Sequence, residues 1–107
     1  RNLSRGLGDV YKRQEYYMHK VGHWMGMDVH DVGPYMQNDN YLEFSEGMIT
    51  TIEPGIYINN KSNADAKWHG IGIRIEDDIL VTKNANENLT SAVPTDPNEI
   101  ESLMNSS

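Results

Sequence analysis

Three closely spaced histidines are the first residues whose types could do chemistry. His19, His23 and His30 fall within twelve residues of one another, and an imidazole can ligate a metal ion or move a proton near neutral pH. Offsets of four and seven residues would align them on one helical face, but the glycines in this stretch argue against one continuous helix. The spacing also lacks the His-Glu-x-x-His order of a zinc-binding helix. On spacing alone, a shared site and three separate structural histidines remain open.

Two glutamates lie where a charge needs an explanation. Glu53 interrupts the apolar stretch of residues 49–56, and a buried carboxylate costs several kcal/mol unless a cation or hydrogen-bond donors compensate for it. Glu76 follows Arg74 by two residues in an alternating segment, so the two side chains share a strand face about 6.5 Å apart. The alternative is that Arg74, Glu76 and Asp78 form a solvated surface row, which would contribute little.

The donor types together indicate a metal site without sulfur. The chain contains no cysteine, and a set of nitrogen and oxygen donors suits Mn²⁺, Co²⁺, Zn²⁺ or Fe²⁺. Paired divalent ions about 3.5–4 Å apart are a known hydrolytic device. An imidazole region, a carboxylate in an apolar strand and a carboxylate beside a cation therefore predict a hydrolytic metal site.

Strands and one helix must position these side chains. Residues 47–58 are β-branched and aromatic around a Pro-Gly pair, which predicts two short strands flanking a bend. Residues 69–81 alternate between aliphatic and charged side chains, which predicts a strand or hairpin. The polar residues 59–67 between them predict a loop. Near the C-terminus, an N-cap at residues 95–96 is followed by a proline and an apolar stripe, which predicts a short closing helix.

Composition limits the classes of protein and of partner. The chain has 107 residues, with 9 Lys and Arg against 16 Asp and Glu and a formal net charge of −7. This length suits one domain, and the acidic balance argues against nucleic-acid binding. No apolar run approaches the roughly 18 residues of a membrane span. We therefore expect a protein without a membrane partner, and a cytoplasmic location because no export signal is visible.

The first fourteen residues differ in composition from the rest. Residues 1–14 hold four cations and one carboxylate, and they are interrupted by glycine without an amphipathic period. We interpret residues 1–14 as a non-native tail, and residues 15–107 as the fold-bearing part of the chain.

Three ordered motifs carry a resemblance to a known family. They are HKVGHWMGMDVHD (residues 19–31), TIEPG (residues 51–55) and GIGIRIED (residues 70–77). Residues 15–107 resemble a C-terminal fragment of the catalytic domain of Xaa-Pro aminopeptidases (aminopeptidase P), which are metallopeptidases of the pita-bread fold. The resemblance implies the α+β class and the C-terminal half of that fold, with a curved antiparallel sheet and flanking helices.

The resemblance also implies roles for individual residues. His23 and Glu53 would each ligate a metal ion and Glu76 would bridge two ions, while Arg74 would orient the bridging carboxylate. His19 and His30 would face the substrate as catalytic residues. The cofactors implied are two divalent ions, usually manganese, with cobalt or zinc as alternatives. The substrate implied is a peptide with proline in second position, cut before that proline, and the full-length protein could be a homo-oligomer.

One departure from the family pattern affects activity. Family members supply two further aspartate ligands upstream, and Asp9 lies in the tail without a strand around it. We therefore expect this fragment to be incomplete and inactive by itself. Three alternatives stay open: a prolidase that cuts Xaa-Pro dipeptides, a non-catalytic pita-bread relative that binds peptides or proteins, and an acidic domain with structural histidines.

Overall fold

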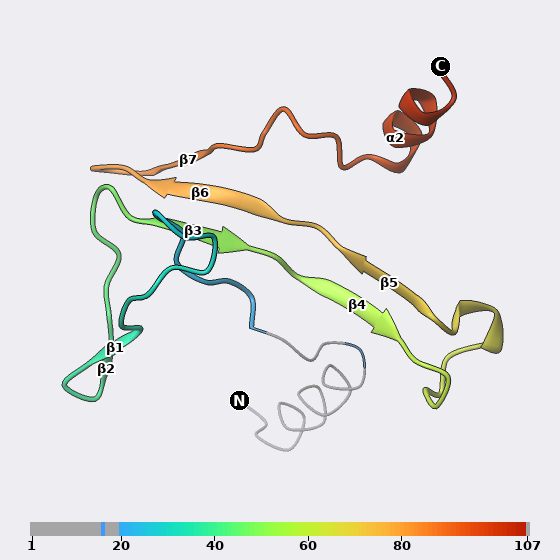
Figure 1. The fold of residues 1–107 in the computed structure, drawn as a ribbon, viewed down its shortest axis with the longest axis horizontal. Helices are drawn as coiled ribbons and strands as arrows, with labels where there is room; N and C mark the ends of the chain where they lie inside the picture. Colours follow the sequence, from blue (N-terminus) through green and yellow to red (C-terminus); the bar gives the residue numbers. More distant parts are fainter. Residues whose placement is uncertain (1–15, 17–19, 107) are drawn as a thin grey trace, which may run out of the picture. The chain divides into compact units, whose positions relative to one another are not determined.

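The computed structural model describes residue 16 and residues 20–106, and short antiparallel strands dominate them (Figure 1). The elements in chain order are β1 (Met36–Gln37), β2 (Asn40–Tyr41), β3 (Ile49–Ile52), β4 (Gly55–Ile58), the 3₁₀ helix η1 (Ala66–Trp68), β5 (Ile71–Arg74), β6 (Asp77–Val81), β7 (Asn86–Asn88) and α2 (Pro97–Met104). The expected tail and His19 lie outside the described residues. Strands together with a terminal helix confirm the α+β class.

The described residues form two compact units, and one of them contains β4, β5 and η1. In this unit β4 pairs antiparallel with β5, which places Ile56 opposite Ile73 and Ile58 opposite Ile71. Because side chains alternate along a strand, these four isoleucines share one face of the pair. Tyr57 lies on the other face, opposite Gly72.

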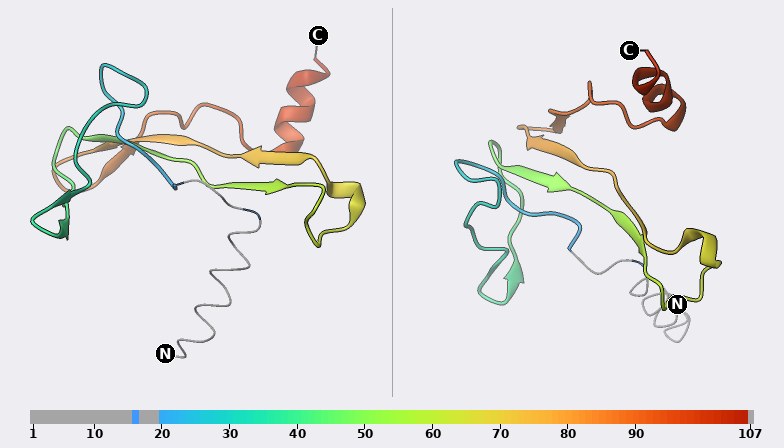
Figure 2. Two further views of the ribbon diagram at one scale, coloured as in Figure 1. Left: turned by 60° about the horizontal axis from the view of Figure 1, so that its bottom comes forward. Right: turned by 45° about the vertical axis from the view of Figure 1, so that its right-hand side comes forward.

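The second unit contains the remaining elements, and its main sheet has the order β3-β6-β7. The register of β3 and β6 places Thr51 opposite Asp78 and Ile52 opposite Asp77. The two strands lie side by side in both views of Figure 2. This register fixes which side chains point to each face of the sheet.

Two further features of this unit have clear local causes. β1 and β2 are joined by Asn38 and Asp39, which both have positive φ values (51° and 63°), as a two-residue type I′ hairpin requires. Helix α2 begins after Asp96, whose side chain accepts a hydrogen bond from the backbone N–H of Glu99, and Pro97 occupies its first turn. These contacts provide an N-cap and a residue already set to the helical φ.

The sequence-based elements agree with the structure in most places. Two strands flank the Pro-Gly bend and the closing helix is present, as predicted. The segment 69–81 forms two strands, β5 and β6, with an interruption at residues 75–76. The predicted loop ends earlier than expected because η1 begins at Ala66. The β1–β2 hairpin and β7 were not predicted, since their strands are only two or three residues long and show no period.

The described residues have no buried apolar core. No hydrophobic side chain among them is buried, and Ile56 and Ile73 are 59% and 62% exposed. Contiguous apolar surface of this kind is uncommon on monomeric proteins and favours association. No helix in this part of the chain has the length and apolar character needed to cross a bilayer.

The open aliphatic face of the β4–β5 pair can be tested directly. Replacing both Ile56 and Ile73 with threonine keeps strand propensity and removes apolar surface. We expect lower binding of an apolar dye such as ANS and less self-association, measured by fluorescence and light scattering. The matched control replaces Val29 and Val32, which are exposed but lie outside any strand. An equal effect of both double variants would contradict the prediction.

Candidate metal centre

The pairing of β3 with β6 brings two distant glutamates together. Glu53 directly follows Ile52, the last residue of β3, and Glu76 directly precedes Asp77, the first residue of β6. Ile52 and Asp77 are partners in the ladder. In an antiparallel pair, the residue after one partner faces the residue before the other. The two carboxylates therefore meet at the end of this ladder.

His23 is held against β3 by backbone hydrogen bonds. The N–H of Thr51 donates to the carbonyl of His23 over 2.9 Å, and the N–H of His23 donates to the hydroxyl of Thr51 over 3.0 Å. Thr51 is 1% exposed, so this anchor is shielded from water. Thr51 and Glu53 are two residues apart and share a strand face, which places His23 on the side of the glutamates.

A glycine allows this close approach. A Cβ atom added to Gly22 would lie 1.9 Å from the carbonyl oxygen of Thr51, a separation that no side chain tolerates. The backbone before His23 therefore needs glycine at this position for steric reasons.

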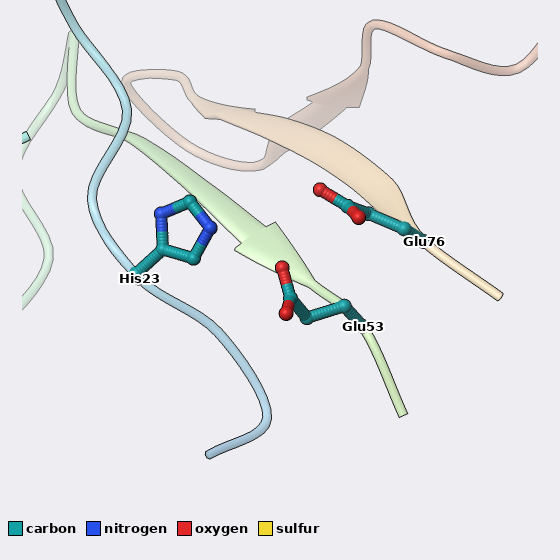
Figure 3. A group of neighbouring side chains, drawn as sticks. All are labelled: His23, Glu53 and Glu76. Atoms are coloured by element: carbon teal, nitrogen blue, oxygen red, sulfur yellow. The ribbon is translucent and has the colours of Figure 1, made fainter. Parts of the chain in front are cut away.

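The three side chains converge on one point. One potential ligand atom from each of His23, Glu53 and Glu76 lies within 4.8 Å of the others. Figure 3 shows the imidazole and the two carboxylates directed toward one another from three separate segments. Glu53 is buried, His23 is half-buried and Glu76 is exposed. Small rotations of these side chains can close the set around a divalent ion, and one nitrogen with carboxylate oxygens suits Mn²⁺, Co²⁺ or Zn²⁺.

The imidazole of His23 is oriented for metal binding. Its Nδ1 lies 2.9 Å from the carbonyl oxygen of Trp24, and a carbonyl can only accept a hydrogen bond. In the neutral imidazole Nδ1 therefore carries the proton, and Nε2 has the lone pair with which an imidazole ligates a metal. A hydrogen bond from the second ring nitrogen to a backbone carbonyl is typical of metal-ligating histidines.

The buried charge of Glu53 has a cationic neighbour. Arg74 Nη1 lies 3.8 Å from Glu53 Oε1, and Arg74 Nε donates to the hydroxyl of Tyr57 over 2.9 Å. The apolar run around Glu53 predicted compensation of its charge by a cation or by hydrogen-bond donors, and Arg74 is such a cation. That Arg74 orients Glu76 stays a prediction, and its ion pair with Glu53 is a contact that was not anticipated.

The remaining site predictions divide between described and undescribed residues. The ring of His30 lies 4.4 Å from the ring of His23, with an angle of 46° between the planes, so His30 lies beside the cluster. His19 falls outside the described residues. The sequence reasoning missed Thr51 and Tyr57. The signal for Thr51 was its parity with Glu53, which lies two residues further along the same strand face, and the signal for Tyr57 was its alternation with Ile56 and Ile58.

The donor set is one that could hold a divalent ion, and comparison with known proteins gives the family of the chain. The model of metallopeptidase family M24 matches residues 2–83, so the chain belongs to this family. It is 48% identical over 92 residues to the Xaa-Pro aminopeptidase of Haemophilus influenzae, covering 86% of this chain and 21% of that protein.

Solved structures agree with this assignment. Pseudomonas aeruginosa aminopeptidase PepP matches with a TM-score of 0.86 and 47% identity, over 95% of this chain and 23% of that one. Zinc-substituted Escherichia coli aminopeptidase P in complex with product matches with a TM-score of 0.81 and 45% identity, over 94% and 22%. The pita-bread fold and the resemblance to Xaa-Pro aminopeptidases are thereby confirmed. The chain spans about a fifth of the length of the curated relatives it matches.

The first site prediction concerns Gly22. Gly22→Ala should displace His23 from Thr51 and weaken Mn²⁺ binding by about tenfold or more. Losses of this size are typical when a residue that orients a metal ligand is removed. Isothermal titration calorimetry would measure this affinity. Gly47→Ala is the control, because Gly47 has a φ of +90° but its added Cβ would meet nothing within 4 Å. Equal affinity losses in both variants would refute the steric argument.

The second prediction concerns the partner of Arg74. Tyr57→Phe removes the hydroxyl that accepts from Arg74 Nε but keeps the aromatic ring. Because the Arg74 side chain is 46% exposed, we expect a Mn²⁺ affinity loss smaller than about tenfold. Tyr41→Phe, on the exposed β2 strand, is the matched control. If the two variants bind Mn²⁺ equally, Tyr57 does not support the site through Arg74.

Proposed function

We propose that this chain carries part of the dinuclear metal centre of an Xaa-Pro aminopeptidase. Such an enzyme hydrolyses the peptide bond between an N-terminal residue and proline. The observation that carries the proposal is the convergence of His23, Glu53 and Glu76 within 4.8 Å. The names of the relatives support it, because Xaa-Pro aminopeptidases of several organisms share 37–49% identity with the chain.

Each residue of the cluster has a chemical role in this proposal. His23 would hold a divalent ion through Nε2, Glu53 would hold one through its buried carboxylate, and Glu76 would be the ligand that two ions share. When bound, divalent ions supply a nucleophile at neutral pH and polarise the carbonyl that is attacked. Arg74 partly neutralises the negative charge of Glu53 and holds the Glu53 side chain in place. His30, beside His23, can exchange a proton with the peptide, and we assign the same role to His19.

The metal proposed is manganese, with cobalt and zinc as alternatives. The donor set of one imidazole and two carboxylates accepts all three ions. A zinc-substituted form of E. coli aminopeptidase P has been solved, which is consistent with a centre that exchanges metals.

The proposed cluster can be tested by metal titration of the chain itself. We expect Mn²⁺ to bind, and His23→Ala to weaken binding at least about tenfold because the only nitrogen donor of the cluster is lost. His69→Ala is the control, since the His69 ring is bonded to the carbonyl of Ala64 and is not in the cluster. Binding unaffected by His23→Ala would contradict the metal centre.

We further propose that residues 15–107 are a catalytic fragment that is inactive alone. We expect the chain to contribute three ligands of the five, since the two further aspartates that the family resemblance implies would come from strands upstream of the histidine segment. With Mn²⁺ added, we expect no cleavage of an Xaa-Pro tripeptide in a peptide-release assay. Turnover that His23→Ala abolishes would show that this expectation is wrong.

The same assay on the full-length gene product separates the rival functions. An Xaa-Pro aminopeptidase should cleave tripeptides, whereas a prolidase should prefer Xaa-Pro dipeptides, and a non-catalytic relative should cleave neither. The cytoplasmic location and the homo-oligomer stay predictions.

A further inference from the structure

Asp78 is a third carboxylate on the side of the sheet that bears the metal ligands. It lies in β6 two residues after Glu76, and alternation along the strand puts both side chains on one face. Asp77, between them, points to the opposite face. The two neighbouring aspartates therefore differ in the face they occupy while having the same charge.

The two aspartates also differ in how their oxygens are satisfied. Asp77 Oδ1 accepts a hydrogen bond from the hydroxyl of Thr90 over 2.8 Å. Asp78 Oδ1 is buried, and it has no hydrogen-bond partner within the described part of the chain. A buried carboxylate oxygen without a partner is costly, so a cation or a donor is needed to compensate for it.

Asp78 lies opposite Thr51, the residue that anchors His23. Its partner across the ladder is Thr51, and side chains directly opposite each other in such a pair are close neighbours. Thr51 anchors His23 through its hydroxyl. Asp78 is thus next to the anchor of one ligand and two residues from another ligand, Glu76.

We propose that Asp78 is a positioning residue of the metal centre, and that its carboxylate is a charge partner of the divalent cation held by His23, Glu53 and Glu76. This inference rests on the proposed function, since it needs that cation. In the metal-free protein, the carboxylates on this face repel one another, and Arg74 is the cation seen beside Glu53. A divalent ion attracts all of these carboxylates and so outweighs their mutual repulsion. Asp78 therefore raises the affinity for the metal and lowers the stability of the metal-free protein.

Adjacent isosteric variants give a crossed test. Asp78→Asn should weaken Co²⁺ binding about tenfold or more and alter the visible absorption spectrum of the bound Co²⁺. It should leave the thermal midpoint of the metal-free protein unchanged or raise it. Asp77→Asn should behave in the opposite way, because it weakens the hydrogen bond from Thr90: its metal-free midpoint should fall and its Co²⁺ affinity should stay within about threefold, as expected for a screened charge.

The possible results separate a failure of the proposed role of Asp78 from a failure of the proposed metal centre. Equal Co²⁺ affinity of the two variants, with binding still lost in His23→Ala, would overturn the role of Asp78 alone. Binding unaffected by His23→Ala would remove the metal centre and the inference with it. A metal-free Asp78→Asn protein that melts earlier or does not fold would assign Asp78 to structural support and also overturn the proposal.

Discussion

The pairing of Ile52 with Asp77 is the interaction on which the site depends. It sets the register of β3 and β6, and that register decides that Glu53 and Glu76 meet at the end of the ladder. A shift of one residue would turn the side chains of one strand to the opposite face. The two carboxylates would then point away from each other. The positions of the two carboxylates are therefore set by the pairing of β3 with β6.

The third residue of the cluster, His23, depends on the same strand through different contacts. Thr51 fixes the backbone of His23 by two hydrogen bonds, and Gly22 provides the space for this approach. The carbonyl of Trp24 then sets which nitrogen of His23 carries the proton. Burial is concentrated here, because Thr51 and Glu53 are the buried polar side chains of the described residues, none of whose hydrophobic side chains is fully buried. The most buried polar side chains therefore belong to the His23–Glu53–Glu76 cluster and to the threonine that anchors it.

The sequence predicted the parts of this arrangement that have a local signal. Glu53 stands out because it interrupts an apolar run, and α2 because Asp96 and Pro97 form a recognisable start. The family resemblance, carried by three motifs, identified His23 and Glu76 as well. The β1–β2 hairpin escaped prediction because its strands are too short to show a period. The contacts of His23 with Thr51 and of Arg74 with Glu53 could not be read from spacing, since they join segments that are distant in sequence and are decided by backbone register.

The most direct test of the shared cation is X-ray absorption at the zinc edge on the zinc-loaded chain. We predict one imidazole nitrogen at about 2.0–2.1 Å from the zinc ion, together with carboxylate oxygens. The imidazole signal should vanish in His23→Ala, although His30 and His69 remain in that variant. A spectrum in which the imidazole signal is absent from the parent protein, or persists unchanged in His23→Ala, would contradict the account.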